Sequence, residues 1–242
     1  MLHFYEIGVM KHKLTSEEEN ARLRGDLLTV ACRVNHDLRT PLGGIVTATE
    51  ALRENLGDHR QSAALTQAIF DSVEEMTRLI RQISIVTRAT AHPLPLEPVN
   101  LSEVVVAVLQ RLESRILKRN ATVIEPPSWP QVHGVAAWLE VIWSNFLTNA
   151  LQHTGDKPRI ELTWREENDW LHFGVTDNGG GVPADVRSRL FQPFHLLYQP
   201  DNAGGLGLSV VQRLVELQGG RCGYEPLADG SLFFFSLPVK GS

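Results

Sequence analysis

Cysteine is scarce in this chain of 242 residues, and long apolar runs and an excess of positive charge are absent. Cys32 and Cys222 are too few for a disulfide framework or a cysteine-rich zinc site, which favours a reducing compartment. No stretch reaches the roughly 20 apolar residues that span a bilayer, so we expect no membrane span. The formal net charge of −5 excludes a general basic footprint for nucleic acid.

Proline is also rare at first and then abundant, which divides the chain. Between Ser16 and Arg88 the only proline is Pro41, whereas residues 91–98 (AHPLPLEP) contain three. Proline ends helices, so we place a boundary here and expect a helical domain over 16–92 and a second domain over 93–242. Residues 1–15 are expected to be a linker or the remnant of a longer chain. In the second domain, β-type runs at 122–124, 160–164, 171–176 and 232–237 alternate with helical runs, which predicts an α/β domain.

Two apolar stripes of helical period predict a hairpin of two long helices in the first domain. The stripe of the first helix comprises Leu23, Leu27, Val30, Val34, Leu38, Pro41, Ile45, Ala48, Leu52 and Leu56. The stripe of the second comprises Leu65, Ile69, Val73, Met76, Ile80 and Ile83. One hairpin cannot cover both stripes, but two hairpins from two chains can, as an antiparallel four-helix bundle. The alternative is that the hairpin packs on the second domain of its own chain.

His36 lies off this apolar stripe, about 200° around the helix by the 100° rule, and is expected to face solvent. Asp37 follows it, and Thr40 is one turn further on nearly the same face. Pro41 removes a helical hydrogen bond, so the helix can bend there. A carboxylate that takes a proton from one imidazole nitrogen leaves the other nitrogen available as a nucleophile toward phosphorus. An ordinary surface histidine is the alternative.

The second domain carries a set of residues suited to a nucleotide. Asn145 and Asn149 are four residues apart in a helical run, and an amide oxygen is a suitable ligand for Mg²⁺ beside a triphosphate. Asp177 ends a β-type run and is suited to accept from an adenine amino group, and the glycines of residues 179–181 let a ligand approach the backbone. Residues 205–208 (GLGL) open a helix whose N–H groups can hold phosphate. Surface asparagines and a glycine-rich turn are the alternatives for these features taken singly.

Taken together, these runs resemble sensor histidine kinases of two-component systems. Residues 36–42 (HDLRTPL) resemble the H-box, 143–150 the N-box, 177–183 the G1 box, 190–194 the F-box and 205–211 the G2 box, in the order of that family. The resemblance implies a dimeric four-helix bundle followed by the two-layer α/β sandwich shared with the gyrase, Hsp90 and MutL ATPases. It further implies a cytoplasmic catalytic core that uses ATP and Mg²⁺, forms a homodimer, receives signals from an upstream sensor and passes a phosphoryl group to the receiver domain of a response regulator.

The resemblance also assigns roles to residues. His36 would accept the phosphoryl group, Asp37 its proton, and Thr40 would assist dephosphorylation of the regulator. Asn149 would bind Mg²⁺. Contacts with the nucleotide would come from Asn145, Asn149, His153, Asp177, Gly179, Gly181, Gly205, Leu206, Gly207 and Leu208.

Several positions depart from the family pattern. Gln152 stands where a lysine is frequent, Ala203 replaces the first G2 glycine, Val135 replaces an acidic residue, and residues 195–202 contain no lysine or arginine. These departures favour a rival hypothesis, a degenerate kinase that acts as a phosphatase or scaffold. A second rival is an ATPase of the gyrase or Hsp90 type, which needs a water-activating glutamate. That position is Val141 here, although Glu140 adjoins it.

Overall fold

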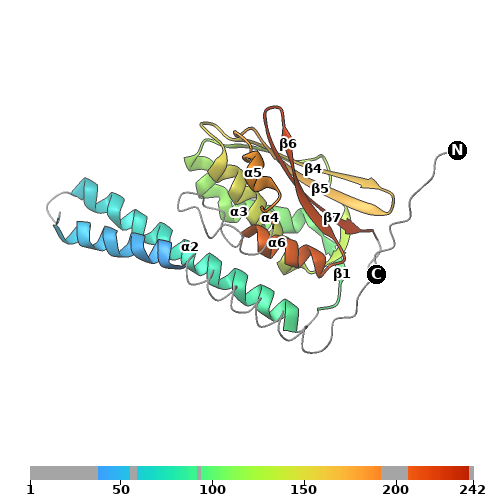
Figure 1. The fold of residues 1–242 in the computed structure, drawn as a ribbon, viewed down its shortest axis with the longest axis horizontal. Coiled ribbons are helices and arrows are strands. Elements are labelled where there is room, and N and C mark those ends of the chain that lie inside the picture. Colours follow the sequence, from blue (N-terminus) through green and yellow to red (C-terminus); the bar gives the residue numbers. More distant parts are fainter. Residues whose placement is uncertain (1–37, 55–58, 92–93, 192–206, 240–242) are drawn as a thin grey trace.

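The computed structural model describes residues 38–54, 59–91, 94–191 and 207–239, and every structural statement below concerns this part of the chain. Within it, a helical hairpin precedes an α/β domain (Figure 1). Residues 55–58, which connect the two helices of the predicted hairpin, lie outside the described residues, as do the stripe residues Leu23, Leu27, Val30, Val34 and Leu56.

The hairpin consists of a helix over residues 38–54 and of α2 (His59–Ala91). On the first helix Pro41 and Ala48 are buried, whereas Leu42 and Val46 are each 50% exposed. The buried face is therefore the one that the apolar stripe predicted. A Cβ at Gly44 would lie 3.2 Å from Ser72 Oγ, so the two helices approach closely at this level.

The α/β domain contains a sheet of five strands in the order β2-β4-β5-β7-β6. β2 pairs with β4 in parallel and the other pairs are antiparallel, so the sheet is mixed. A second, two-stranded sheet joins β1 to β3. The bounds of the strands are β1 (Glu97–Asn100), β2 (Thr122–Ile124), β3 (Gln131–Gly134), β4 (Arg159–Glu167), β5 (Trp170–Asp177), β6 (Arg221–Leu227) and β7 (Gly230–Pro238).

Helices cover one face of the five-stranded sheet (Figure 1). They are α3 (Leu101–Lys118), α4 (Ala136–His153) and α6 (Gly207–Glu216), with the short α5 (Ala184–Arg187) beside them. The core between the layers is aromatic: Trp143 of α4 packs edge-on against Phe173 and Phe235, with ring centroids 6.2 and 5.6 Å apart. This arrangement confirms the predicted two-layer α/β sandwich. The predicted β-type runs correspond to β2, β4, β5 and β7.

The start of α4 is held by a side chain that the sequence analysis did not single out. Val135, the N-cap residue, gives α4 no side-chain cap. Instead, the fully buried Gln218 accepts a hydrogen bond from the Val135 N–H at 3.0 Å and donates to the Leu214 carbonyl. Gln218 thus fastens the end of α6 to the start of α4, the two helices that carry most of the candidate site.

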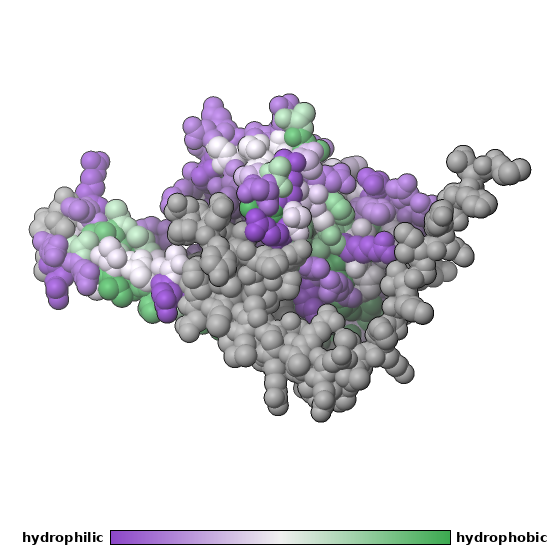
Figure 2. Space-filling view, viewed as in Figure 1, coloured by the Kyte–Doolittle hydropathy of each residue, from purple (hydrophilic) through white to green (hydrophobic). Residues whose placement is uncertain are grey.

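The C-terminal part of α2 packs on the α/β domain, mainly against α6. Ala89 is only 2% exposed and belongs to the core of that domain, and Ile85 packs against it. The predicted alternative, packing of the hairpin on its own chain, is therefore realised for this part of α2. The remainder projects beyond the domain, and Phe70, Val73 and Ile80 are 62%, 46% and 52% exposed. Figure 2 shows apolar side chains on the projecting hairpin.

Candidate functional site

Asp177 lies at the end of β5, where the alternation of side chains along the strand directs its carboxyl toward the helical layer. Leu171, Phe173 and Val175 alternate along β5 and are buried, and Asp177 continues this series at the strand end, only 5% exposed. One carboxyl oxygen accepts the N–H of Gly179 at 2.8 Å. Burial raises the pKa of the Asp177 carboxyl, while the Gly179 N–H, the charge of His153 and the Thr154 hydroxyl act in the opposite direction.

Thr154, which follows α4, places a hydroxyl beside this carboxyl. A Cβ at Gly179 would lie 2.8 Å from Asp177 Oδ1 and 3.3 Å from Thr154 Oγ1, so all three groups meet at one point. Thr154 is 3% exposed, and apart from its interaction with the Asp177 carboxyl its Oγ1 has no hydrogen-bond partner among the described residues. The hydroxyl oxygen can also accept a hydrogen bond, and a ligand or water would have to supply that donor. The site therefore offers a ligand both a carboxyl and a hydroxyl.

The loop after β5 depends on close backbone approach. Gly181 has a φ of +73°, a conformation that glycine adopts without strain. Gly230, at the start of β7, packs so closely on the Asp177 carbonyl that a Cβ there would overlap with it. The Tyr224 hydroxyl accepts the Val182 N–H at 2.9 Å. β6 and β7 therefore fix the loop that the glycine run predicted.

Asn145 forms a second cluster, where α2, α4 and α6 meet. It is 2% exposed, its Nδ2 donates to the Val141 carbonyl at 2.7 Å, and its Oδ1 accepts from Arg78 Nη1 at 3.3 Å. Gly207, the first residue of α6, approaches so closely that a Cβ there would overlap with Asn145 Oδ1. Leu208 follows it and is buried.

The two clusters lie at opposite ends of one face of α4. Asn145, Asn149 and His153 recur every four residues, so they lie in a row that rises by about 12 Å. Asn149, in the middle, is half-buried, and His153 is exposed. The arrangement fits an extended ligand that is bound by Asp177 at one end and by the start of α6 at the other.

The structure thus brings together Asp177, Gly179 and the end of α4, and separately Asn145 and Gly207. Thr40 is exposed on the helix of residues 38–54, as expected. The predicted site residues His36, Asp37, Gly205 and Leu206 lie outside the described residues.

Three contributors escaped the sequence analysis. Thr154 adjoins His153 and was within reach of sequence reasoning. Gly230 follows Asp229 in a pattern typical of a hairpin turn, but its contact with Asp177 is not encoded locally. Arg78 is 67 residues from Asn145, and no local pattern pairs them.

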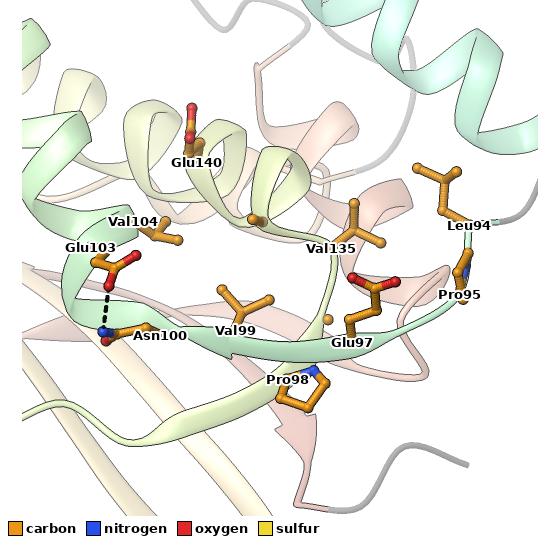
Figure 3. Close-up of a pocket in the computed structure, with 12 residues that line it drawn as sticks. Leu94, Pro95, Glu97, Pro98, Val99, Asn100, Glu103, Val104, Val135 and Glu140 are labelled. Carbon is orange, nitrogen blue, oxygen red and sulfur yellow. Dashed lines mark hydrogen bonds between the residues drawn. The ribbon is translucent and has the colours of Figure 1, made fainter.

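A cavity of about 540 Å³ lies elsewhere, between β1 and the starts of α3 and α4 (Figure 3). Glu97, Glu103 and Glu140 are among the residues that line it, but Asp177 is not. Glu103 accepts a hydrogen bond from Asn100, and Glu140 forms an ion pair with Arg111 at 2.6 Å. Among the described residues, no group of three or more His, Cys, Asp or Glu side chains could hold a metal ion.

A mixed sheet covered on one face by helices, with a buried carboxyl at a strand end beside a glycine loop, defines a nucleotide-binding α/β sandwich. Comparison with known families agrees. Residues 134–241 match the family described as histidine kinase-, DNA gyrase B- and HSP90-like ATPase, and residues 27–91 match the His Kinase A (phospho-acceptor) domain. This chain belongs to the sensor histidine kinases of two-component systems.

Individual relatives agree with this assignment. The chain is 30% identical over 229 residues to the methanogenesis regulatory histidine kinase FilI of Methanothrix harundinacea, covering 92% of this chain and 25% of FilI. It is 29% identical over 209 residues to the sensory histidine kinase/phosphatase NtrB of Rhizobium leguminosarum, covering 79% of this chain and 53% of NtrB. The chain spans 25%, 39% and 65% of the length of three curated relatives.

Solved structures support the fold. The histidine kinase ThkA, in complex with the response regulator protein TrrA, aligns with a TM-score of 0.70 and 21% identity, over 95% of this chain and 69% of ThkA.

None of the helices in the described ranges is both long and apolar enough to cross a bilayer.

Proposed function

We propose that this chain is the catalytic core of a sensor histidine kinase, which transfers the γ-phosphoryl group of ATP to His36 and then to an aspartate of a response regulator. The observation that carries the proposal is the combination, in one chain, of a match to the phospho-acceptor domain with a buried carboxyl, Asp177, in a domain that matches the ATPase family. The hairpin would supply the nucleophile and the α/β domain the phosphoryl donor.

In the first step, an imidazole nitrogen of His36 attacks the γ-phosphorus. The bond between that phosphorus and the bridging oxygen breaks, ADP leaves, and the proton of the other imidazole nitrogen passes to Asp37. In the second step, a carboxylate oxygen of the regulator attacks the phosphorus, the bond between phosphorus and the His36 nitrogen breaks, and Asp37 returns its proton so that His36 is again a neutral imidazole. Catalysis of such transfers depends mainly on positioning and on neutralisation of charge.

The pocket residues have separate parts in this proposal. Asp177, with Thr154 beside it, would hold adenine, and the loop at Gly179 and Gly181 would pass close to the base. Asn145, His153 and the segment Gly205–Leu208 would line the rest of the nucleotide. Asn149 would give an amide oxygen to Mg²⁺, which when bound neutralises charge on the phosphate oxygens.

The proposal extends to organisation and partners. Residues 16–92 would form the dimerisation and phosphotransfer domain, residues 93–242 the ATP-binding domain, and residues 1–15 a linker from an upstream sensor. The protein would act in the cytoplasm as a homodimer and would bind the receiver domain of a response regulator. Two relatives of this chain are a histidine kinase and a sensory histidine kinase/phosphatase, which supports both kinase and phosphatase activity here.

The main competitor is an ATPase of the gyrase or Hsp90 type, in which a glutamate activates water. Glu140 is the nearest candidate in this chain, but its carboxylate pairs with Arg111 of α3 at 2.6 Å, and Glu140 belongs to the lining of the separate cavity of Figure 3. An acid engaged in this way is poorly placed to take a proton beside Asp177. This observation favours a kinase, whose nucleophile comes from the hairpin.

Incubation with γ-labelled ATP and Mg²⁺ tests the proposal, because it shows where the phosphoryl group goes. A kinase retains the label on the protein in an acid-labile, alkali-stable form, and an ATPase releases it as free phosphate. A degenerate kinase gives neither product and can still dephosphorylate a regulator.

The homodimer leads to a prediction at the exposed apolar face of α2. Val73→Glu in the full chain should convert the dimer to a monomer at micromolar concentration, because each partner would bury a carboxylate in the bundle at a cost of several kcal/mol. Sedimentation velocity measures the change. Ala64→Glu is the matched control: Ala64 is exposed and lies nine residues away, on the opposite side of α2. A dimeric Val73→Glu variant, or a monomeric wild type, would contradict the proposed bundle.

Thr40→Ala should separate the two activities of the hairpin. Thr40 is exposed and follows His36 by four residues in the sequence, so in the proposed helix its hydroxyl can orient water near the regulator's phosphoryl group, whereas Asp37 would take the proton of His36. We expect autophosphorylation to be mostly retained and stimulated release of phosphate from the regulator to fall at least tenfold. Thr47→Ala, also exposed on this helix, is the control. Parallel loss of both rates would instead indicate that Thr40 only stabilises the turn before Pro41.

A further inference from the structure

Arg78 connects the hairpin to the ATP-binding domain at the candidate site. Its Nη1 donates to Asn145 Oδ1 at 3.3 Å, although 67 residues separate the two. The contact is part-buried, and α2 packs on α6 around it. One turn earlier on α2, Glu74 lies 3.8 Å from Arg115 of α3, so α2 touches two helices of the domain.

The guanidinium reaches the point where α6 begins. Asn145 Oδ1, its acceptor, packs against Gly207, and no Cβ fits between them. The N-terminus of α6 is the part of the pocket proposed to receive the phosphates, because its N–H groups and dipole favour an anion. Arg78 therefore brings a fixed positive charge to the phosphate end of the pocket, about 12 Å along α4 from the end at His153.

Arg78 is also level with the phosphoacceptor end of the hairpin. Gly44 and Ser72 lie opposite each other in the antiparallel pair. Six residues before Gly44 is Leu38, and six residues after Ser72 is Arg78, so these two positions share a level. Leu38 packs against the core of the α/β domain and follows His36 by two residues.

The phosphates of a nucleotide bound at the start of α6 need a positively charged partner, and residues 192–206, which precede α6, do not supply one. A triphosphate carries several negative charges, which phosphoryl-transfer enzymes neutralise with Arg, Lys or Mg²⁺. Residues 192–206 contain no lysine or arginine, and Arg189 before them donates to the Asp185 carbonyl at 3.0 Å. A guanidinium has five N–H donors in one plane and can hold an amide oxygen and a phosphate oxygen together.

We infer that Arg78 is a phosphate-binding residue that the phosphoacceptor hairpin delivers to the nucleotide pocket, with Asn145 holding its guanidinium in place; this inference rests on the proposed function. Arg78 replaces the missing cation of residues 192–206 and couples packing of α2 on α6 to occupancy by a triphosphate. Nucleotide binding and hairpin docking therefore favour each other.

The test measures dissociation constants of AMP, ADP and a non-hydrolysable ATP analogue with Mg²⁺ for the chain of 242 residues. In Arg78→Gln, the ATP analogue should bind about tenfold more weakly, ADP a few-fold more weakly and AMP as in the wild type. Arg78→Lys should bind the ATP analogue with an affinity between those of the wild type and Arg78→Gln, because lysine keeps the charge but not the planar geometry. Arg81→Gln, which removes an exposed charge from the next turn of α2, should bind all three nucleotides as the wild type does.

Each binding result decides whether Arg78 binds the phosphates of the nucleotide. Equal weakening for AMP and the ATP analogue would make Arg78 a structural residue and overturn the inference. Unchanged or tighter binding of the ATP analogue would also overturn it, and tighter binding would identify the Arg78–Asn145 contact as a latch that excludes nucleotide. These results leave the proposed kinase intact, whereas a wild type that binds none of the three would overturn both. If Arg78→Gln does not fold, the comparison of Arg78→Lys with Arg81→Gln carries the same test.

Discussion

Replacing His36 with glutamine should abolish the incorporation of label from γ-labelled ATP into the protein. Glutamine keeps the polarity and approximate size of the side chain but has no basic nitrogen to attack phosphorus, so the loss should exceed about a hundredfold. The wild type should carry one acid-labile, alkali-stable phosphoryl group on each phosphorylated chain, which is the stability of a phosphohistidine. Scintillation counting after gel separation and acid or alkali treatment measures both properties.

His172→Gln is the control for this experiment. His172 lies on β5 and is half-buried, so the substitution removes an imidazole without touching the hairpin. It should be labelled as well as the wild type. If His36→Gln is labelled to the same extent as the wild type, the phosphoacceptor is another residue and the central proposal is wrong.

Asp177→Asn and Asn149→Ala should each abolish the thermal stabilisation that ATP gives to the protein. A ligand at 100 times its Kd stabilises by about 2.7 kcal/mol. That is roughly 5 to 10 °C in Tm for a chain of this size. The amide introduced by Asp177→Asn can still accept the Gly179 N–H but offers no carboxylate to adenine, and the methyl group left by Asn149→Ala offers no oxygen to Mg²⁺. Differential scanning fluorimetry with millimolar Mg-ATP measures the shift, and Asp185→Asn, at an exposed acid of α5, is the control. Wild-type shifts in both variants would show that the nucleotide binds elsewhere.

Without ATP, Asp177→Asn should be more stable than the wild type, whereas with ATP it should lack the stabilisation that the wild type gains. Because burial raises the pKa of this carboxyl above its ordinary value of 3.8, ionisation costs stability in the fold as pH rises from about 3.8 through the raised value. Asp177→Asn avoids this cost. Without ATP, the variant should therefore gain stability relative to the wild type between about pH 4 and pH 7, and the gain should vanish below the ordinary value. Chemical unfolding at several pH values measures it, and an apo variant that is less stable at neutral pH would contradict the expected desolvation of Asp177.

The hairpin and the sandwich were predictable because local patterns specify them. The stripe that includes Pro41 and Ala48 has the helical period, and the same residues are buried in the fold. Asp177 was predictable as a strand-end residue because the alternation of β5 continues to it. The two asparagines of α4 share a face for the same reason of periodicity, and only the structure shows that Asn145 is buried against Gly207 while Asn149 is half-buried.

The sequence alone determined which segments are helices and strands and which residue types cluster at loop ends, because hydrophobic period, proline and glycine act over a few neighbouring residues. It could not specify contacts between distant segments, which depend on how whole elements pack. Only the tertiary structure brought Gly230 against Asp177, placed the Gln218 side chain at the start of α4, and set Arg78 beside Asn145. These contacts join elements that are far apart in the chain, and each exists because burial of one shared core fixes the elements together.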